Sequence, residues 1–273
     1  MCEGEMRVSE SRKTAVITGA NAGIGFQAAL KLAEDGTRIL MACRSMDKAK
    51  QARSEILARV PRADIEILPL DVSEPSSVRE FAGRFGEQFG KLDILINNAG
   101  IVTPHLSRNS LGHELHLATN YLGAFALTGL LLPFFNKEQP TRIVNICSLA
   151  HRFGKFDFDD PNWNNTTYNH WKAYARSKIA TASFTMELNR RLHQKGSSTI
   201  CLGAHPGFAA TDMGRKTGAT TPKTAFSRWY QEKMEAWIVA SPARAAEPMI
   251  HAASAGSVSG GDYYGPSGLF EIK

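Results

Sequence analysis

Short apolar runs of strand length alternate with longer amphipathic segments along most of the chain. The runs are apolar throughout rather than alternating with polar residues, which is typical of strands in a parallel sheet that helices cover on both faces. Each run is followed by a segment whose apolar residues recur with the period of a helix. Strands are expected at 14–19, 38–43, 65–72, 92–100, 141–148, 198–207 and, briefly, 262–268.

Strands that alternate with helices of this length predict an α/β fold of the doubly wound Rossmann type, with a parallel sheet of about seven strands. Ser73 is expected to cap the third helix, because a Ser ahead of a helical run can accept a hydrogen bond from the first free amides. No repeat or linker interrupts the pattern, so we expect a single domain over 1–273 with a flexible N-terminus at 1–11. Helices are expected at 24–36, 46–60, 73–90, 112–135, 169–192 and 241–254.

Two long segments, 149–173 and 208–240, interrupt the alternation. Each follows the carboxyl end of an expected strand, where doubly wound folds bind ligands, and long irregular segments are often functional. We expect 213–240 to form an apolar substrate lid and 153–171 to form the wall opposite it. The lid's aromatic and Met residues also recur at helical spacing, which fits a helix packed in the core equally well. These residues are Phe226, Trp229, Tyr230, Met234 and Trp237.

Composition and charge exclude several classes of function. The formal net charge is +6, but no basic run is longer than a pair, which indicates a solvated surface and no nucleic-acid binding. The four Cys residues are scattered, which predicts buried thiols in a reducing compartment and no metal site. The N-terminus lacks the apolar segment of a signal peptide, and the longest apolar stretch, 121–135, is too short to span a bilayer. We therefore expect a cytoplasmic protein without a membrane anchor.

The sequence TGANAGIG at 18–25 joins an expected strand to an expected helix. Glycines permit a tight turn here and let the backbone approach a pyrophosphate, towards which the helix directs its free amides. A glycine-rich match alone also fits a purely structural turn, but the strand before it and the helix after it are the context that dinucleotide binding requires. The candidate cofactor-binding residues are Gly19, Asn21, Ala22, Gly23, Ile24 and Gly25.

The end of the second expected strand bears on the choice between NAD and NADP. Proteins that bind NAD usually place an acid there, which accepts hydrogen bonds from the ribose. This chain has Arg44, which can pair with a 2′-phosphate, so we predict NADP(H). Lys48 is a weaker second candidate, and Asp47 is expected to cap the next helix or face solvent. The alternative is that Arg44 is a surface charge and NAD is bound.

Polar residues also end the third and fourth expected strands. Asp71, followed by Val72, is placed to reach the amino group of an adenine. Asn98, Ala99 and Gly100 suit hydrogen bonds to the backbone and close approach to a ribose, although their sequence is also an ordinary turn signal. These residues extend the candidate nucleotide site along one edge of the sheet.

At this point six motifs, in this order, resemble the short-chain dehydrogenase/reductase family over roughly residues 12–268. The resemblance implies a Rossmann-type fold and hydride transfer between a nicotinamide cofactor and an alcohol or carbonyl group. The motifs are TGANAGIG at 18–25, NNAG at 97–100, TNYLG with Asn120, VNICS ending in Ser148, YARSK at 174–178 and HPGFAAT at 205–211.

Tyr174 and Lys178 are four positions apart on an expected helix and therefore share a face. An ammonium favours the phenolate form of a neighbouring phenol, so Tyr174 can exchange a proton with a substrate oxygen. Ser148, at the end of a strand, can donate a hydrogen bond to that oxygen. The resemblance further implies that Lys178 binds the nicotinamide ribose, that Asn120 orders a relay water and that Thr211 contacts the carboxamide.

The roles of several other residues near these motifs are less specific. Pro206 and Gly207 are cofactor-binding candidates because they precede Thr211 in the same motif. Asn120 has a second interpretation, in which it only bridges a kink in its helix. Arg176 is unassigned and expected to face solvent. The histidines have no triad spacing and are expected to be structural or near the substrate: His151, His170 and His205.

The long segment between Ser148 and Tyr174 resembles the retinol dehydrogenase and WW-domain-oxidoreductase branch, and ILMACR also resembles protochlorophyllide reductases. Such relatives imply a bulky apolar substrate. We predict an NADP(H)-dependent oxidoreductase that interconverts an alcohol and its ketone or aldehyde, with Tyr174 as the acid and base. The alternatives are NADPH-dependent reduction of a C=C bond in a conjugated substrate and a non-catalytic NADPH-binding scaffold. Relatives often pair through the helices that follow the fourth and fifth strands, which implies a possible homo-oligomer.

Overall fold

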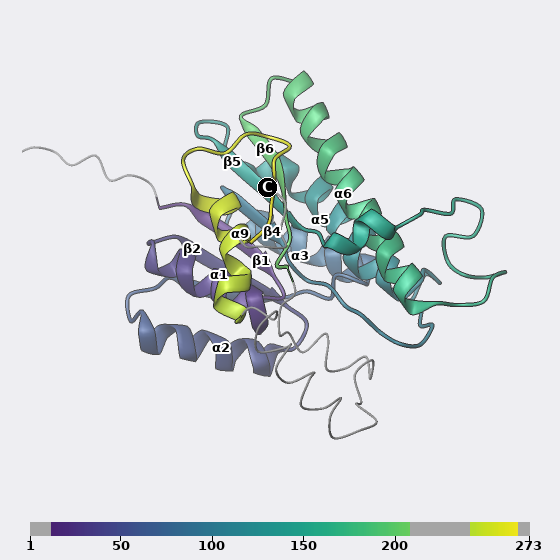
Figure 1. Cartoon of the computed structure of the whole chain (residues 1–273). Coiled ribbons are helices and arrows are strands. Elements are labelled where there is room, and N and C mark those ends of the chain that lie inside the picture. The colour runs from purple at the N-terminus through teal and green to yellow at the C-terminus, as the bar shows by residue number, and fades with distance from the viewer. Residues whose placement is uncertain (1–11, 208–240, 267–273) are drawn as a thin grey trace, which may run out of the picture.

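The computed structural model describes residues 12–207 and 241–266 of the chain. Its centre is a parallel sheet of seven strands in the order β3-β2-β1-β4-β5-β6-β7 (Figure 1). The chain changes direction across the sheet between β1 and β4, and the carboxyl ends of these strands are the switch point where Rossmann folds bind dinucleotides. The predicted fold class is confirmed. The strands are β1 Thr14–Thr18, β2 Arg38–Cys43, β3 Ile65–Pro69, β4 Ile94–Asn97, β5 Thr141–Ile146, β6 Thr199–Ala204 and β7 Tyr263–Tyr264.

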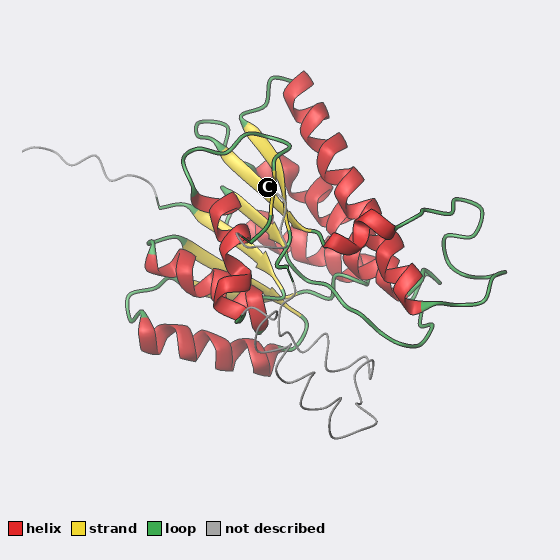
Figure 2. Cartoon of the chain, viewed as in Figure 1, coloured by secondary structure: helices red, strands yellow, loops and turns green. Residues whose placement is uncertain are grey.

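Helices cover both faces of the sheet (Figures 1 and 2). Helix α1 packs against α9 on one face, and α3 packs against α5 on the other. Strand β1 sends Ala15 and Ile17 into the first layer and Val16 into the second. Both of its faces are buried, which explains why the three positions between Thr14 and Thr18 are all apolar. The long helices are α1 Gly23–Glu34, α2 Met46–Arg59, α3 Pro75–Gln88, α6 His170–Gln194 and α9 Pro242–Ser254.

The helical segment that follows β4 is not a uniform α-helix. The sequence predicted one helix over 112–135, but the structure contains a π-helical turn that includes Asn120. Turns of this kind are rare and occur frequently at functional sites. Asn120 therefore lies in an irregular turn of its helix. The pieces are α4 Leu115–Leu117, the π turn η1 Ala118–Leu122, α5 Gly123–Leu131 and the 3-10 turn η2 Leu132–Phe134.

The same segment corrects the prediction that the longest apolar stretch is too short to span a bilayer. Leu115–Phe134 forms 20 helical residues and, among the described residues, is the one helix long and apolar enough to cross a membrane by length and composition. Half of its apolar window is buried inside the protein. Because core helices of soluble proteins meet the same criteria, length and composition do not distinguish the two cases.

The start of α3 also differs from the prediction. Its N-cap is Glu74 and not Ser73, because Pro75 occupies the first turn, where the fixed φ of proline suits a helix start. Ser73 instead donates to Asp71 Oδ1 through both its hydroxyl, at 2.6 Å, and its amide, at 3.0 Å. Ser73 therefore orients the Asp71 carboxylate at the edge of the sheet.

Candidate active site

The turn from β1 to α1 has a backbone geometry that favours glycine. Gly19 and Gly23 have φ angles of 66° and 58°. A Cβ atom on Gly25 would overlap the Asn98 amide and the Gly19 carbonyl, so no larger residue fits there. Asn98 Nδ2 donates to the carbonyls of Thr18, at 2.8 Å, and Gly19, at 3.3 Å. The end of β4 therefore holds the turn in place.

The amino end of α1 is open beside this turn. Its N-cap, Ala22, has no side chain that can accept a hydrogen bond from the first amides of the helix. Free amides and the positive end of the helix dipole favour an anion at this point. Asn21, Ala22 and Ile24 surround the helix start, as the sequence indicated. These residues fit the pyrophosphate of a dinucleotide.

Arg44 and Asp71 stand together at the carboxyl edge of the sheet, after β2 and β3. Arg44 Nη1 lies 3.4 Å from Asp71 Oδ2, and the Arg44 side chain is 74% exposed. Val72 is buried beside them. Asp47 lies in the first turn of α2. The two residues assigned to the adenosine half of the cofactor are therefore adjacent, and Arg44 stays accessible to a ligand.

Tyr174 and Lys178 lie on α6 next to the end of β5. Lys178 Nζ donates to the Ile146 carbonyl at 2.7 Å and lies 5.7 Å from the centre of the Tyr174 ring. A Cβ atom on Gly100 would lie 3.8 Å from the same Nζ. Lys178 is 6% exposed, and a buried ammonium has three donors that need partners. The described residues supply one hydrogen bond, which leaves donors for a ligand.

Asn120 joins the loop after β4 to α6. Its Oδ1 accepts from the Ile101 amide at 2.8 Å, and its Nδ2 donates to the Ile101 carbonyl at 3.1 Å and to Ser177 Oγ at 3.0 Å. Its own carbonyl accepts from Thr181 Oγ1 at 3.0 Å. Ser177 in turn donates to the carbonyl of Tyr174. The π turn thus fixes the helix that carries Tyr174.

Ser148 is the N-cap of a 3-10 turn, η3 Leu149–Phe153, directly after β5. Its Oγ accepts from the Ala150 amide at 3.2 Å, and its carbonyl accepts from His151 Nδ1 at 2.5 Å. A hydroxyl has one donor and two acceptor sites, so the Ser148 hydrogen stays available for a substrate oxygen. Ser148 can therefore cap this turn and donate to a substrate oxygen at the same time.

The carboxyl end of β6 carries His205, Pro206 and Gly207. The buried ring of His205 stacks on Tyr263 with 5.4 Å between centroids, and its Nδ1 accepts from the Gly207 amide at 3.2 Å. Burial, and secondarily the charge of His151, lowers the pKa of His205, which therefore acts as a neutral support for this turn. Thr211, the lid expected at 213–240 and the N-terminus at 1–11 lie outside the described residues.

Arg176 corrects a prediction, because it is buried rather than solvent-facing. It is 6% exposed, and its Nη1 donates to the Asp160 carbonyl at 2.6 Å. Its guanidinium lies 4.4 Å from the centre of the Trp163 ring, and Nη2 lies 3.7 Å from Asp157. Because Arg176 is two residues after Tyr174 on the helix, its side chain points well away from that of Tyr174. Arg176 therefore ties α6 to the long segment before it.

Sequence analysis also missed a buried group next to Tyr174. Glu114 and His116 are almost fully buried, and His116 meets the Tyr174 ring edge-on. Tyr168, from the long segment, donates to Glu114 at 3.0 Å. The sequence contained one indication of this cluster, because an acid and a histidine stand at the start of a helix that is otherwise apolar.

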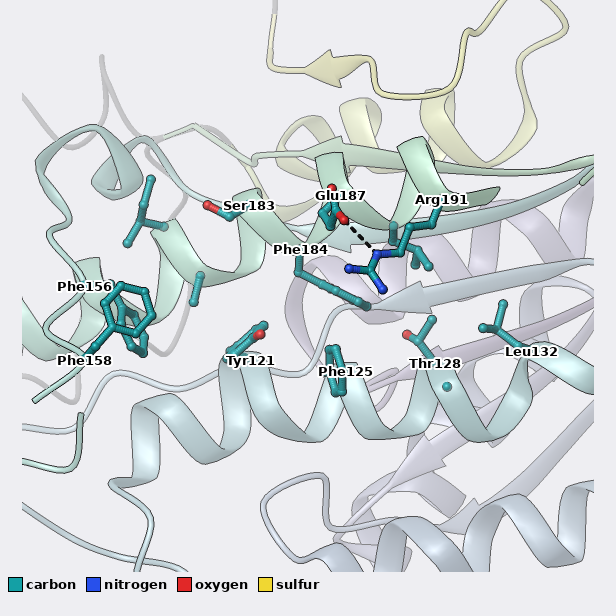
Figure 3. A pocket seen from close by; sticks show the side chains of 14 residues that line it. Tyr121, Phe125, Thr128, Leu132, Phe156, Phe158, Ser183, Phe184, Glu187 and Arg191 are labelled. Carbon is teal, nitrogen blue, oxygen red and sulfur yellow. Dashed lines mark hydrogen bonds and ion pairs between the residues drawn. The ribbon is translucent and has the colours of Figure 1, made fainter. Parts of the chain in front are cut away.

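A groove of about 570 Å³ runs between α5 and α6 (Figure 3). Phe125 and Phe184 point into it, and the paired side chains of Glu187 and Arg191 line its α6 side. The described residues that line it include none of the four catalytic candidates. The groove is therefore separate from the cluster at the strand ends.

Cys43, Cys147 and Cys201 are buried and free, as the sequence predicted. Burial raises the pKa of Cys43 and of Cys147 to about 11. No group of three or more His, Cys, Asp or Glu residues within 12–207 and 241–266 is arranged to hold a metal ion.

A parallel sheet with a glycine turn at its switch point, and a Tyr–Lys pair beside it, defines a Rossmann-type oxidoreductase. The family model for short chain dehydrogenases matches residues 13–222. The chain belongs to the short-chain dehydrogenase/reductase family.

Two similar relatives belong to one branch of this family. The chain is 42% identical to human retinol dehydrogenase 13 over 244 residues, which cover 89% of this chain and 72% of that protein. It is 36% identical to human retinol dehydrogenase 11 over 88% of this chain and 72% of that protein. The resemblance to the retinol dehydrogenase branch is confirmed.

Solved structures agree with the fold. An uncharacterised protein of Mycobacterium paratuberculosis is 35% identical, with a TM-score of 0.73 over 93% of this chain and 80% of its own. YwfH, an NADPH-dependent reductase of bacilysin biosynthesis, is 21% identical, with a TM-score of 0.75 over 96% of this chain and all of its own. The second likeness concerns the fold alone.

Proposed function

We propose that the protein is an NADP(H)-dependent oxidoreductase that interconverts an alcohol and its ketone or aldehyde. The observation that carries the proposal is the pair of Tyr174 and Lys178, with Nζ 5.7 Å from the phenol ring and hydrogen-bonded to the end of β5. Asn120, in the π turn η1, donates to Ser177 on α6, and Ser148 follows β5, whose end accepts from Lys178. These contacts support a site that combines a proton donor, a cation and a second hydrogen-bond donor.

The chain's residues would divide the chemistry as follows. A bound nicotinamide supplies or accepts the hydride. Tyr174 gives a proton to the carbonyl oxygen during reduction and takes it from the alcohol during oxidation, and Lys178 stabilises the phenolate. Ser148 donates its free hydrogen to the same oxygen and steadies the charge that develops on it. The glycine turn and Asn98 would hold the cofactor against these groups.

The preference for NADP rests on Arg44. Its exposed guanidinium at the end of β2 suits the 2′-phosphate, which an acid at that place would repel. Arg44→Asp should weaken NADPH binding strongly and leave NADH binding nearly unchanged. Lys48→Asp is the matched control, because Lys48 is the weaker candidate and should change the preference less. An unaltered preference in Arg44→Asp would refute the choice of cofactor.

We propose a bulky apolar carbonyl compound as the substrate class. Support comes from the similarity to retinol dehydrogenases. The alternative, reduction of a conjugated C=C bond, uses the same Tyr and Lys but different substrates. A dark assay of NADPH oxidation with saturated ketones and with enones separates the two. Turnover with neither, despite NADPH binding, would favour the scaffold alternative.

Tyr174→Phe tests the mechanism. General acid–base groups contribute about 10²–10⁴-fold, so turnover should fall by at least about 100-fold while the Kd for NADPH stays within about twofold. Wild-type activity in this variant would refute the role of Tyr174. The single-domain organisation, the lid and the cytoplasmic location stay predictions, and recovery of the chain without detergent tests the last.

The possible homo-oligomer also stays a prediction. The face of α5 and α6 around the groove is the surface to test, because Phe125, Leu130 and Met186 expose their apolar side chains on these two helices. Sedimentation of Phe125→Glu beside the wild type would measure whether copies pair there.

A further inference from the structure

A buried polar cluster lies beside Tyr174, and the proposed mechanism uses none of its residues. Glu114 and His116, at the start of the helix that carries Asn120, are 1% and 0% exposed. The His116 ring meets the Tyr174 ring edge-on, with 6.2 Å between centroids and 67° between planes. The residue that exchanges the proton therefore packs against a fully buried imidazole.

The hydrogen bonds assign one tautomer to that imidazole. Thr103 donates its amide to His116 Nε2 at 3.0 Å, and His116 Nδ1 lies 2.7 Å from Glu114 Oε1. A backbone amide can only donate, so Nε2 carries the lone pair and Nδ1 carries the proton. Burial by itself would raise the pKa of Glu114, but hydrogen bonds from the His116 side chain and from the His116 and Leu117 amides hold it below its usual value. The pair is a carboxylate and a neutral imidazole.

His116 and Asn120 are one helical turn apart and hold the same loop. Asn120 bonds both backbone groups of Ile101, and His116 accepts from Thr103. This loop follows Gly100, which lies against Asn120 and Lys178. A change at His116 therefore reaches the reacting groups by two routes, directly through the Tyr174 ring and indirectly through the loop.

Glu114 connects this cluster to the long segment before α6. Tyr168 donates its hydroxyl to Glu114 Oε1 at 3.0 Å, and the Glu114 amide donates to Asn162 Oδ1 at 3.0 Å. Burial and the Glu114 carboxylate raise the pKa of Tyr168, so it stays a donor. Asn169, the next residue, caps α6. The carboxylate thus fixes both the imidazole and the start of the helix that carries Tyr174.

We propose that His116 is a positioning residue for Tyr174 and that Glu114 holds it in the Nδ1–H tautomer. The inference rests on the proposed function, because it assigns a role towards the Tyr174 proton transfer. A ring locked by hydrogen bonds on both sides gives the phenol a fixed edge to pack against. Its loss leaves the Thr103 amide without a partner, which costs free energy when buried, and frees the Tyr174 ring to move. Displacements of about 1 Å in an active site can reduce rates by about 100-fold.

The experiment compares His116→Asn with a matched control. The Asn amide can keep a donor near Glu114 but supplies neither the ring edge nor an acceptor at Nε2. We expect kcat to fall by about 10–100-fold, with the Kd for NADPH measured by fluorescence within about twofold of the wild type. Asn136→Ala is the control, because it removes a buried hydrogen bond to Asp93 at the opposite edge of the sheet. It should lower Tm and leave kcat within about twofold.

A purely structural role predicts a different pattern. Both variants would then lose Tm while kcat per folded molecule stayed at the wild-type value, and that result for His116→Asn would overturn the proposal. If His116→Asn does not fold, ¹⁵N NMR of the wild-type imidazole decides instead. An Nδ1–H tautomer supports the proposal, whereas an Nε2–H tautomer or an imidazolium overturns it. A wild type that binds NADPH but reduces no carbonyl compound would refute the proposed function instead, and the tautomer could still be measured.

Discussion

Arg176 and Lys178 are two buried cations that stand two residues apart on α6, each 6% exposed. Lys178 donates to the carbonyl at the end of β5 and lies beside Tyr174. Arg176 donates to the Asp160 carbonyl, approaches Asp157 and covers the Trp163 ring. The Lys is held by one hydrogen bond among the described residues, whereas the Arg is matched by a carbonyl, a carboxylate and an aromatic face.

The difference separates a cation placed for a ligand from one placed for the fold. Burying a charge costs free energy unless partners replace its water. Arg176 has three such partners on the segment before α6, so its contacts stabilise the chain itself, although its buried Nε has no hydrogen-bond partner among the described residues. Lys178 keeps unused donors in a buried position, an arrangement that makes sense when a ligand supplies the missing partners.

Lys178→Met should have the largest effect, and the effect should fall on activity. Met preserves the apolar stem but removes the ammonium that favours the Tyr174 phenolate, so kcat should fall by about 10²–10⁴-fold. NADPH binding should weaken as well, because the ammonium is proposed to hold the ribose. Tm should stay the same or rise, since a buried charge is lost. Steady-state kinetics measure the loss of activity, and thermal unfolding measures Tm. A large loss of Tm with a normal kcat would mean that Lys178 serves the fold and not the reaction.

Arg176→Met should have the opposite profile. Removal of one partner from a largely buried network should lower the free energy of unfolding by about 2–3 kcal/mol. Trp163 has a φ of 57°, an uncommon value for a large residue, and its ring loses the guanidinium above it. Denaturant unfolding measures the loss. With a bulky substrate, KM should rise more than kcat falls, because the affected segment is the proposed wall of the substrate site.

Arg176→Lys is the matched control for the charge. Lysine keeps a cation but lacks the planar group that stacks on Trp163 and donates in two directions. If the stacking and the planar array of donors matter, Arg176→Lys should keep only part of the stability that Arg176→Met loses. Full recovery would mean that the positive charge alone holds the segment.

The contrast between these two residues also explains what the sequence could predict. Apolar runs, the glycine turn and the Tyr–Lys spacing are local patterns, and they predicted the sheet, the switch point and the cluster around Lys178. The burial of Arg176 depends on Asp160 and Trp163, whose own conformations depend on the rest of the long segment. No periodicity in the chain encodes such a contact. The same holds for the His116–Thr103 hydrogen bond, which joins a helix to a loop that carries no motif.

Two smaller errors of prediction have different causes. Ser73 is a good capping residue, but Pro75 fixes the start of α3 one residue later. The π turn around Asn120 lies in an apolar segment whose period barely differs from that of an α-helix over one turn. The Asn120 carbonyl in this turn accepts from Thr181 on the neighbouring helix, a contact between elements that the sequence pattern does not contain.

Glu187→Gln should have the smallest effect and completes the comparison with an exposed ion pair. Arg190 and Arg191 donate to Glu187 at 2.7 Å, and their hydrogen bonds lower the pKa of Glu187 to about 2. A lowered pKa means that the pairs stabilise the fold above the ordinary pKa of a glutamate, and that this contribution is lost as the pH falls towards about 2.

All three side chains are exposed, however, so solvent and salt screen the attraction. We therefore expect an unchanged Tm at about 0.15 M salt, and a small decrease at low salt near neutral pH that disappears in acid. A decrease in Tm as large as that of Arg176→Met would mean that burial does not determine how much a cation on α6 contributes to stability.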